Sequence, residues 1–234
     1  MLTLKKSLTS SIGKKYLMSL TGLALLIFLI THLLGNISLY KLDGGQTFNA
    51  YTKYLASFGV LLYIAEIGLV LTFLVHIIAA FTVKKSHSDA RPVGYKMYRS
   101  KGIETSNVSS RNMIVTGIVI LVFLIVHVWQ FKFGPSVPEG YVTQLNGEPS
   151  RDLARLVNEV FHNPLWVIGY VSVMIFVGFH LRHGFWSAFQ SLGAMTPRLS
   201  KPIYCLGVIT AFLLSVGFLF IPIWIYFDLG GALK

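Results

Sequence analysis

Five long apolar runs, separated by shorter polar segments, set the pattern of this chain. Each run is close to the ~20 residues that an α-helix needs to cross the hydrocarbon core of a bilayer. Lipid cannot hydrogen-bond to an exposed backbone, and the runs lack the alternation of a membrane β-barrel, so each run is predicted to be helical. We therefore expect an all-α fold: a single membrane domain, residues 1–234, built as a bundle of five transmembrane helices. The predicted spans are residues 16–37, 58–83, 112–131, 164–189 and 202–227.

The composition supports a membrane protein. Hydrophobic residues make up 54% of the chain and charged residues only 12%, against roughly a quarter charged residues in soluble domains. The net charge of +11 does not indicate nucleic-acid binding, because the basic residues lie in the segments between the apolar runs, where they act as topology signals. A single cysteine, Cys205, excludes an internal disulfide and a cysteine-ligated iron–sulfur cluster, and no Cys-x-x-Cys-His motif for c-type haem is present.

The basic residues also predict the orientation. Of the 20 Lys and Arg residues, 14 lie in the N-terminal segment, in the loops after the second and fourth spans or, in the case of Arg182, near the inner end of the fourth span. The positive-inside rule places this side in the cytoplasm, so the N-terminus is expected inside and the C-terminus outside. The Met1–Lys15 segment is basic, but no small-residue cleavage site follows the first run, which is interpreted as a retained helix.

One further helix is expected outside the spans, at residues 150–162. Ser150 could cap it, and its apolar residues fall on one face. That pattern is typical of a helix lying on the outer membrane surface. The apolar residues are Leu153, Leu156, Val157, Val160 and Phe161.

Histidines are the candidate functional residues. Two of the seven, His87 and His162, lie in polar segments and are expected to be exposed. The other five lie inside the first four spans: His32, His76, His127, His180 and His183. Ionisable groups inside a membrane are costly and usually functional, although any single histidine can simply hydrogen-bond between helices.

These histidines fall into two pairs according to their predicted depth in the membrane. His32 and His127 both lie late in outward-running spans, whereas His76 and His180 lie late in inward-running ones. At ~1.5 Å rise per residue the two levels differ by roughly 15 Å. Two neutral imidazoles at one depth can ligate a haem iron from both faces. The first four spans are therefore expected to enclose two b-type haems.

His180 and His183 are three residues apart and lie on similar faces of a helix, so spacing does not choose between them. His183, beside Arg182, is closer to the inner surface. These two side chains are candidates for contacts with haem propionates, or are merely interfacial.

These residues resemble the single-polypeptide dihaem cytochrome b anchor of succinate:quinone oxidoreductases and quinol:fumarate reductases. The resemblance covers essentially the whole chain. It is carried by Phe28-Leu29-Ile30-Thr31-His32-Leu33, Phe48-Asn49, His76 with Ala80-Phe81-Thr82, His127-Val128-Trp129, Phe179-His180, Gly184-Phe185-Trp186-Ser187 and Thr196-Pro197-Arg198.

The resemblance implies a function. His32 and His127 would ligate the outer haem and His76 and His180 the inner one, and the motif after Phe179 selects His180 over His183. This chain has Arg182-His183 where family members have Ser-Asn, which puts the detailed propionate contacts in doubt.

The resemblance also implies partners. A flavoprotein subunit and an iron–sulfur subunit would dock on the cytoplasmic face of a prokaryotic inner membrane, where succinate is oxidised, and higher oligomers of the complex are allowed. The loop after the second span, with seven basic residues, is a candidate docking face or only a topology signal. Electrons would pass to a membrane quinone, commonly menaquinone in dihaem members.

Quinone chemistry needs a proton partner near a haem edge. Glu66 is the only acidic residue well inside a span, ten residues before His76 and so ~15 Å further outward. It is the candidate proton donor and acceptor for the quinone, the alternative being an interfacial residue turned to headgroups.

Two other functions stay open at this point. One is the cytochrome b subunit of a hydrogenase or formate dehydrogenase, which the distribution of one ligand per span disfavours. The other is a haem-free transporter, for which the sequence shows neither an inverted repeat nor discontinuous helices.

Overall fold

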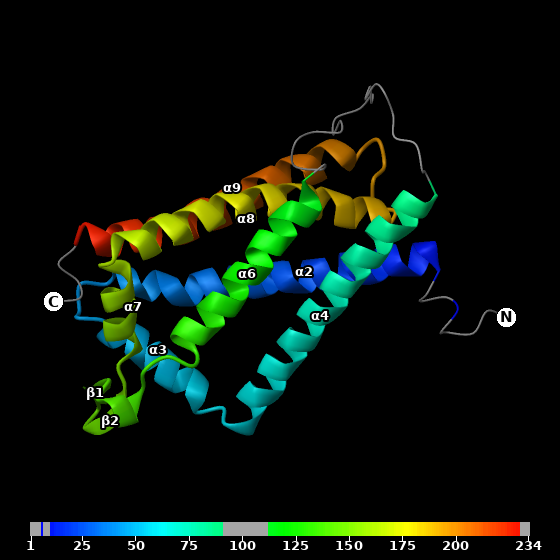
Figure 1. Ribbon diagram of the computed structural model, residues 1–234. Coiled ribbons are helices and arrows are strands. Elements are labelled where there is room, and N and C mark those ends of the chain that lie inside the picture. The colour runs from blue at the N-terminus through cyan, green and yellow to red at the C-terminus, as the bar shows by residue number, and fades with distance from the viewer. Residues whose placement is uncertain (1–5, 7–9, 91–111, 230–234) are drawn as a thin grey trace. The chain divides into compact units, whose positions relative to one another are not determined.

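The computed structural model describes Lys6, residues 10–90 apart from the His87 side chain, and residues 112–229. In that part of the chain, five helices are long and apolar enough to cross a membrane, as the five apolar runs predicted (Figure 1). They are α2 (Ser11–Asn36), α4 (Val60–Asp89), α6 (Met113–Phe131), α8 (Pro164–Ser191) and α9 (Ser200–Tyr226). The chain is therefore a mostly helical, multi-pass membrane protein.

The helix ends differ from the predicted ones by a few residues. The largest differences are at α2, which begins at Ser11, and at α4, which ends at Asp89. The extension of α4 places the backbone of His87 on a helix, where a polar loop had been predicted. Most of the basic loop that follows, residues 91–111, lies outside the described residues.

Large apolar side chains cover the surface of the long helices. On α4, Ile64, Ile67 and Leu71 are each more than half exposed. A soluble protein seldom exposes a continuous apolar surface of this kind, whereas lipid tails solvate it. The exposure pattern thus agrees with the length and composition of the helices.

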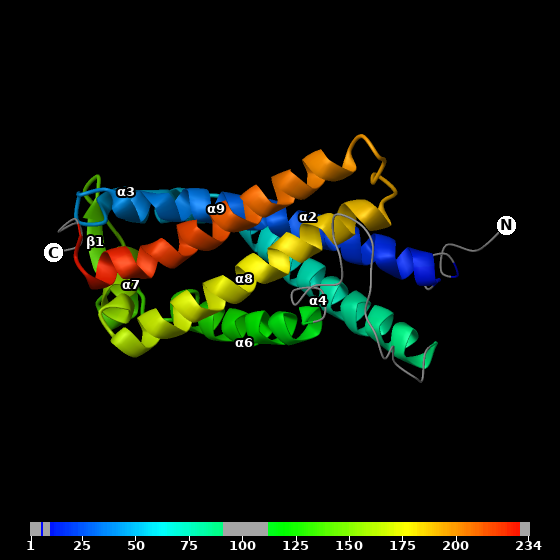
Figure 2. The same cartoon turned by 90° about the horizontal axis from the view of Figure 1, so that it is seen from above.

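A group of short elements lies next to the long helices and is called the cap here. It comprises η1 (Ile37–Tyr40), α3 (Gln46–Ala56), β1 (Val142–Leu145), β2 (Glu148–Arg151) and α7 (Leu153–Phe161). Helix α3 contacts each of the other four elements, and Figures 1 and 2 both show the labelled elements α3, β1 and α7 close together. Neither α3 nor the two strands were predicted from the sequence.

The two strands form an antiparallel hairpin, which corrects the expectation of an all-α fold. Val142 pairs with Arg151, and Leu145 pairs with Glu148. Asn146 and Gly147 make the turn with φ of 55° and 80°. Asn-Gly is the dipeptide that best tolerates two positive φ values in a two-residue hairpin turn, so this pair was a sequence signal for the hairpin.

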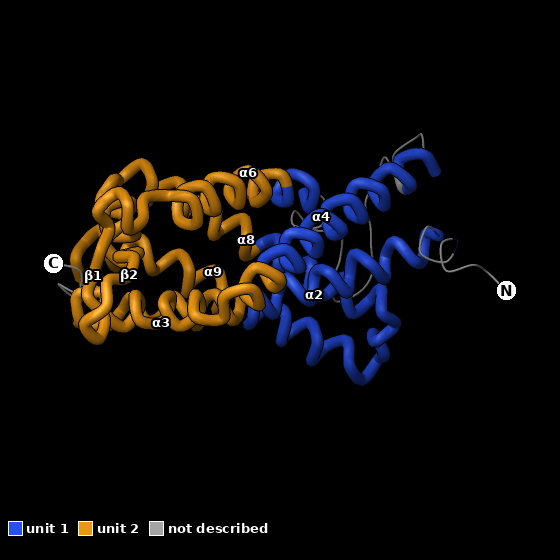
Figure 3. Tube along the Cα trace, turned by 90° about the horizontal axis from the view of Figure 1, so that it is seen from below, with its two compact units in different colours: residues 1–28, 66–117, 179–212 blue, residues 29–65, 118–178, 213–234 orange. Residues whose placement is uncertain are grey.

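The described chain divides into two compact units (Figure 3). Unit 1 comprises residues 1–28, 66–117 and 179–212, and unit 2 comprises residues 29–65, 118–178 and 213–234. Every one of the five long helices contributes a segment to each unit. The cap belongs to unit 2.

Helix α7 packs its apolar face into the core of unit 2. Val157 and Phe161 belong to a buried cluster with Leu39, Phe48 and Tyr170. The predicted apolar face is therefore confirmed, and it is covered by protein. The position of this helix at the outer membrane surface stays a prediction.

The N-cap of α7 is Asp152, whose side chain accepts a hydrogen bond from the Arg155 backbone N–H (3.0 Å). Ser150, the predicted cap, lies in β2 opposite Thr143. Asp152, two residues after Ser150, suits the N-cap position because its charged carboxylate also complements the positive end of the helix dipole.

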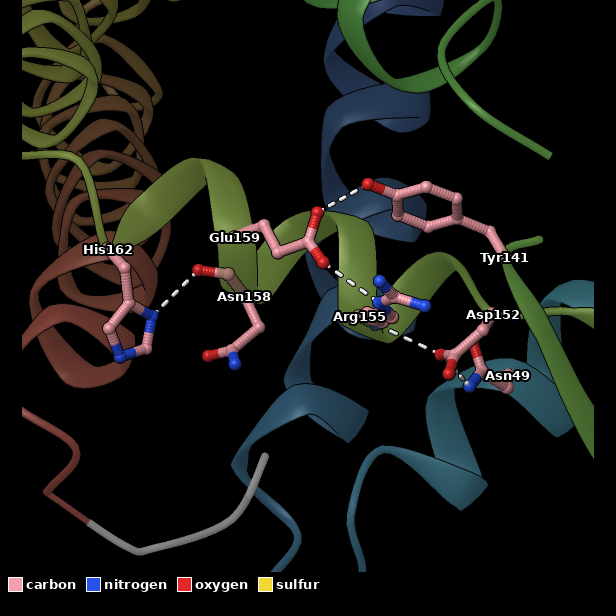
Figure 4. Close-up of polar contacts among 7 residues, drawn as sticks. All are labelled: Asn49, Tyr141, Asp152, Arg155, Asn158, Glu159 and His162. Carbon is pink, nitrogen blue, oxygen red and sulfur yellow. Dashed lines mark hydrogen bonds and ion pairs between the residues drawn. The ribbon is translucent and has the colours of Figure 1, made fainter. Parts of the chain in front are cut away.

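Polar contacts hold the cap together (Figure 4). Asn49, 1% exposed, donates to Asp152 Oδ1 (2.8 Å) and accepts from the Ala154 backbone N–H (2.9 Å). Glu159 accepts from the Tyr141 hydroxyl and from Arg155 (2.8 Å). These bonds, the Tyr141 bond most, hold the pKa of the Glu159 carboxyl below its usual value. The contacts tie α3 and the residues before β1 to α7.

Candidate functional site

The structure brings His32 and His127 together within unit 2. Their ring centroids are 5.8 Å apart and their planes are nearly perpendicular, at 89°. Metal–imidazole nitrogen bonds of about 2 Å would place the centroids of two axial ligands roughly 6 Å apart. Perpendicular planes are compatible with such a pair, since each ring can turn about its own metal–nitrogen axis.

Aromatic side chains surround this pair. Phe123 stacks on His127 at 5.4 Å and Phe131 meets the His127 ring edge-on at 5.3 Å. On the other ring, Phe218 lies 5.6 Å from His32. Three aromatic side chains therefore contact the pair. The neutral imidazole is the form that ligates iron.

The proton of His127 can be assigned from its neighbour Tyr170. The Tyr170 hydroxyl donates its one proton to Gln130 Oε1 (2.7 Å). Its oxygen also lies 3.4 Å from His127 Nδ1. With the Tyr170 proton directed at Gln130, this contact is a hydrogen bond when His127 carries its proton on Nδ1, which leaves the lone pair on Nε2.

Unit 1 contains the second pair, His76 and His180, which are close enough for their charges to interact. His76 Nδ1 is 3.2 Å from the Met18 carbonyl oxygen and 3.2 Å from Thr21 Oγ1. A carbonyl oxygen only accepts, so His76 Nδ1 carries the proton. Its Nε2 therefore carries the lone pair, as in His127.

His180 follows the same rule. Its Nδ1 lies 3.1 Å from Thr116 Oγ1. The Thr116 hydroxyl donates to the carbonyl oxygens of Asn112 (3.2 Å) and Met113 (3.1 Å). When its proton is directed there, the hydroxyl oxygen is able to accept from His180 Nδ1, which leaves the lone pair of that ring on Nε2.

Two glycines leave room beside the rings in unit 1. A Cβ atom added at Gly22 would lie 3.2 Å from His76 Cε1, and one added at Gly117 would lie 3.5 Å from His180 Cε1. A methyl group at Gly22 would press on the His76 ring, whereas one at Gly117 would make ordinary van der Waals contact with the His180 ring. The glycine on α2 thus allows close approach of an imidazole.

The residues present fit haem. Metal-ligating histidines almost always donate their second ring N–H to a fixed acceptor, which orients the ring and its lone pair. Three of the four predicted ligands meet this requirement through Nδ1. Two nitrogens are an incomplete set for a bare ion, but haem iron needs only two axial ligands because the porphyrin supplies the other four.

Arg182, a candidate propionate contact, is held against α9. Its guanidinium donates to the Tyr204 hydroxyl (2.6 Å) and lies 5.7 Å from the centroid of that ring. His183 is within electrostatic reach of His180. Both residues belong to unit 1, as does the His76/His180 pair.

Glu66, the candidate quinone residue, lies on α4 in unit 1 with a partly exposed side chain. His162, predicted to be exposed, is exposed, and its Nδ1 donates to the Asn158 carbonyl oxygen (2.8 Å).

Four residues in the polar contacts of the predicted ligands were missed in the sequence. Thr21, Thr116 and Tyr170 each bond to a histidine, and Gln130 bonds to Tyr170. Each is an uncharged polar residue inside or at the end of an apolar run. Such residues are common in membrane helices, and only the packing of the helices shows which of them face a histidine.

Among the residues described, no group of three or more His, Cys, Asp or Glu side chains is arranged to hold a metal ion. Comparisons with protein-family models, curated proteins and solved structures gave no match to this chain. The family assignment therefore remains a prediction from the motifs.

Proposed function

We propose that this chain is the membrane anchor and dihaem electron-transfer subunit of a succinate dehydrogenase or fumarate reductase complex. In this proposal His32 and His127 hold one b haem, and His76 and His180 hold the other. Each haem would take up and release one electron at a time. The chain would connect an iron–sulfur subunit on the cytoplasmic face to a membrane quinone, with menaquinone as the expected species.

The observation that supports the proposal best is the arrangement of the histidines. They form two pairs, one in each compact unit, and in three of the four Nδ1 lies within hydrogen-bond distance of an oxygen atom. A histidine that serves only to join two helices has no need of a partner histidine. Two such pairs in one chain are a feature of electron transfer across a membrane.

The second candidate is the cytochrome b subunit of a hydrogenase or formate dehydrogenase. It would use the same pairs and differ in its soluble partners. The order of motifs on α2, α4, α6 and α8 favours the succinate and fumarate family. Co-purification with identification of the attached subunits decides between the two.

The first prediction concerns haem content. The purified complex is expected to contain two b haems per copy of this chain, because four histidines form two pairs. Pyridine haemochrome absorbance, measured against the amount of this chain by quantitative amino-acid analysis, gives the ratio. A ratio near one would contradict the pairing scheme, and a ratio near zero would contradict the proposed function.

The second prediction concerns orientation. A reporter fused after Lys234 is expected to be active outside the cytoplasm, and one inserted between Lys84 and Arg111 inside it, because 14 of 20 basic residues lie on the predicted inner side. Paired phosphatase and fluorescent-protein fusions measure both positions. The reverse pattern would move the soluble subunits to the other face and exchange the inner and outer haem assignments.

A further inference from the structure

Two buried hydroxyl groups face one histidine of each pair. Thr116, 5% exposed, bonds to His180, and Tyr170, 6% exposed, bonds to His127. We infer that Thr116 and Tyr170 are positioning residues, each of which sets the tautomer, the ring orientation and the basicity of one axial histidine. The inference rests on the proposed function, because it assumes that the histidines ligate haem.

The single proton of the Thr116 hydroxyl limits the hydrogen bonds that this side chain can make. A hydroxyl has one proton, and two backbone carbonyl oxygens of the preceding turn of α6 lie within reach of that of Thr116. When the proton is directed at either carbonyl, the hydroxyl oxygen accepts from His180 Nδ1–H at 3.1 Å, which is the arrangement that a ligand binding through Nε2 requires. Thr116 is on α6 and His180 on α8, so the bond also holds the ring relative to a second helix.

The Tyr170 hydroxyl also has one proton, which it donates to Gln130 Oε1 on α6, one turn beyond His127. The Tyr170 ring is held by Phe123 at 5.0 Å and by Phe161 at 4.9 Å, both edge-on. The hydroxyl is therefore fixed in place by packing as well as by Gln130.

An acceptor on Nδ1–H makes the imidazole a more basic ligand. A more basic ligand stabilises the oxidised iron more than the reduced iron, which lowers the reduction potential. Removing either hydroxyl is therefore expected to raise the reduction potential of one haem. Because Thr116 and Tyr170 serve different pairs, each change is expected to affect a different haem.

His76 offers an internal comparison. Its Nδ1 has two acceptors, the Met18 carbonyl oxygen and the Thr21 hydroxyl. Loss of the Thr21 hydroxyl leaves the carbonyl in place, so Thr21→Val is expected to cause a smaller shift than Thr116→Val. Both substitutions replace a hydroxyl by a methyl group of similar size.

The experiment is potentiometry of the two haems in the purified complex, followed by their absorbance, with low-spin electron paramagnetic resonance signals as a second measure. In Thr116→Val one of the two reductive steps is expected to move to higher potential, and in Tyr170→Phe the other step. Thr116→Ser restores the hydroxyl and should restore the step. Ser19→Ala is the matched control, since it removes a buried hydroxyl of unit 1 that donates to the Lys15 carbonyl oxygen.

Several outcomes overturn the inference. These are two haems whose potentials and resonance signals do not change in either variant, a shift of the same step in both variants, or a shift of equal size in Ser19→Ala. Loss of a haem in Thr116→Val that Thr116→Ser does not reverse would also overturn it, as the role would then be packing. A wild-type complex without haem would instead contradict the proposed function itself.

Discussion

Replacing His180 with alanine is expected to remove one of the two b haems, whereas His183→Ala is expected to keep both. Spacing alone did not separate these neighbours on α8. The structure adds a physical reason, because the Thr116 hydroxyl lies 3.1 Å from His180 Nδ1, where it is able to accept the ring proton and leave the lone pair on Nε2. His76→Ala should match His180→Ala, since both remove a ligand of the same pair.

Haem loss can be distinguished from misfolding by the other haem. In His180→Ala the His32/His127 pair is unchanged and should still give one haem per chain with a normal spectrum. Pyridine haemochrome analysis of purified variants, with subunit content checked by gel, measures this. If His183→Ala lost a haem while His180→Ala kept two, the motif-based choice between them would be wrong.

Glu66→Gln is expected to slow quinone-linked turnover strongly and leave both haems in place. The substitution keeps the size of the side chain and removes the proton that a carboxyl group exchanges. Succinate oxidation with an artificial dye should be unaffected, because that reaction takes electrons before they reach the quinone. The comparison of the two activities in one preparation therefore isolates the quinone step.

The proposed direction of electron flow gives the reason for placing the quinone near Glu66. Electrons entering from the cytoplasmic side would reach the His76/His180 haem first and the His32/His127 haem second. A quinone reduced near the second haem takes its protons from the outer side. The membrane potential then helps electrons move outward, at ~2.3 kcal/mol per elementary charge per 100 mV. Such help is needed for menaquinone, whose potential lies below that of succinate and fumarate.

A carboxylate in the cap provides the matched control. Glu148 is paired with Lys53 at 2.6 Å on the exposed surface of unit 2, and surface pairs of this kind contribute little to stability. Glu148→Gln should leave both activities unchanged. Quinone activity near that of the wild type in Glu66→Gln would remove Glu66 from the mechanism and direct attention to a residue such as Thr72.

The cap shows where sequence reasoning went wrong and why. Asn146-Gly147 was a readable hairpin signal that was not used, because the surrounding segment was interpreted as a loop. Asp152 and Ser150 were both acceptable helix caps by residue type. The hairpin decided between them, since the pairing of Ser150 with Thr143 takes that residue into a strand.

The sequence by itself determined the five long helices, because a single apolar segment in a bilayer can hydrogen-bond its own backbone groups only as a helix. It also predicted the relative depths of the histidines, because the rise of a helix is constant, and from them the pairing of His32 with His127, whose ring centroids lie 5.8 Å apart. Only the tertiary structure decided which polar groups face those histidines. Thr116 and Tyr170 are 64 and 43 residues from their partners, and a hydrogen bond over such a separation depends on how α6 and α8 are packed against each other, which neither helix encodes alone.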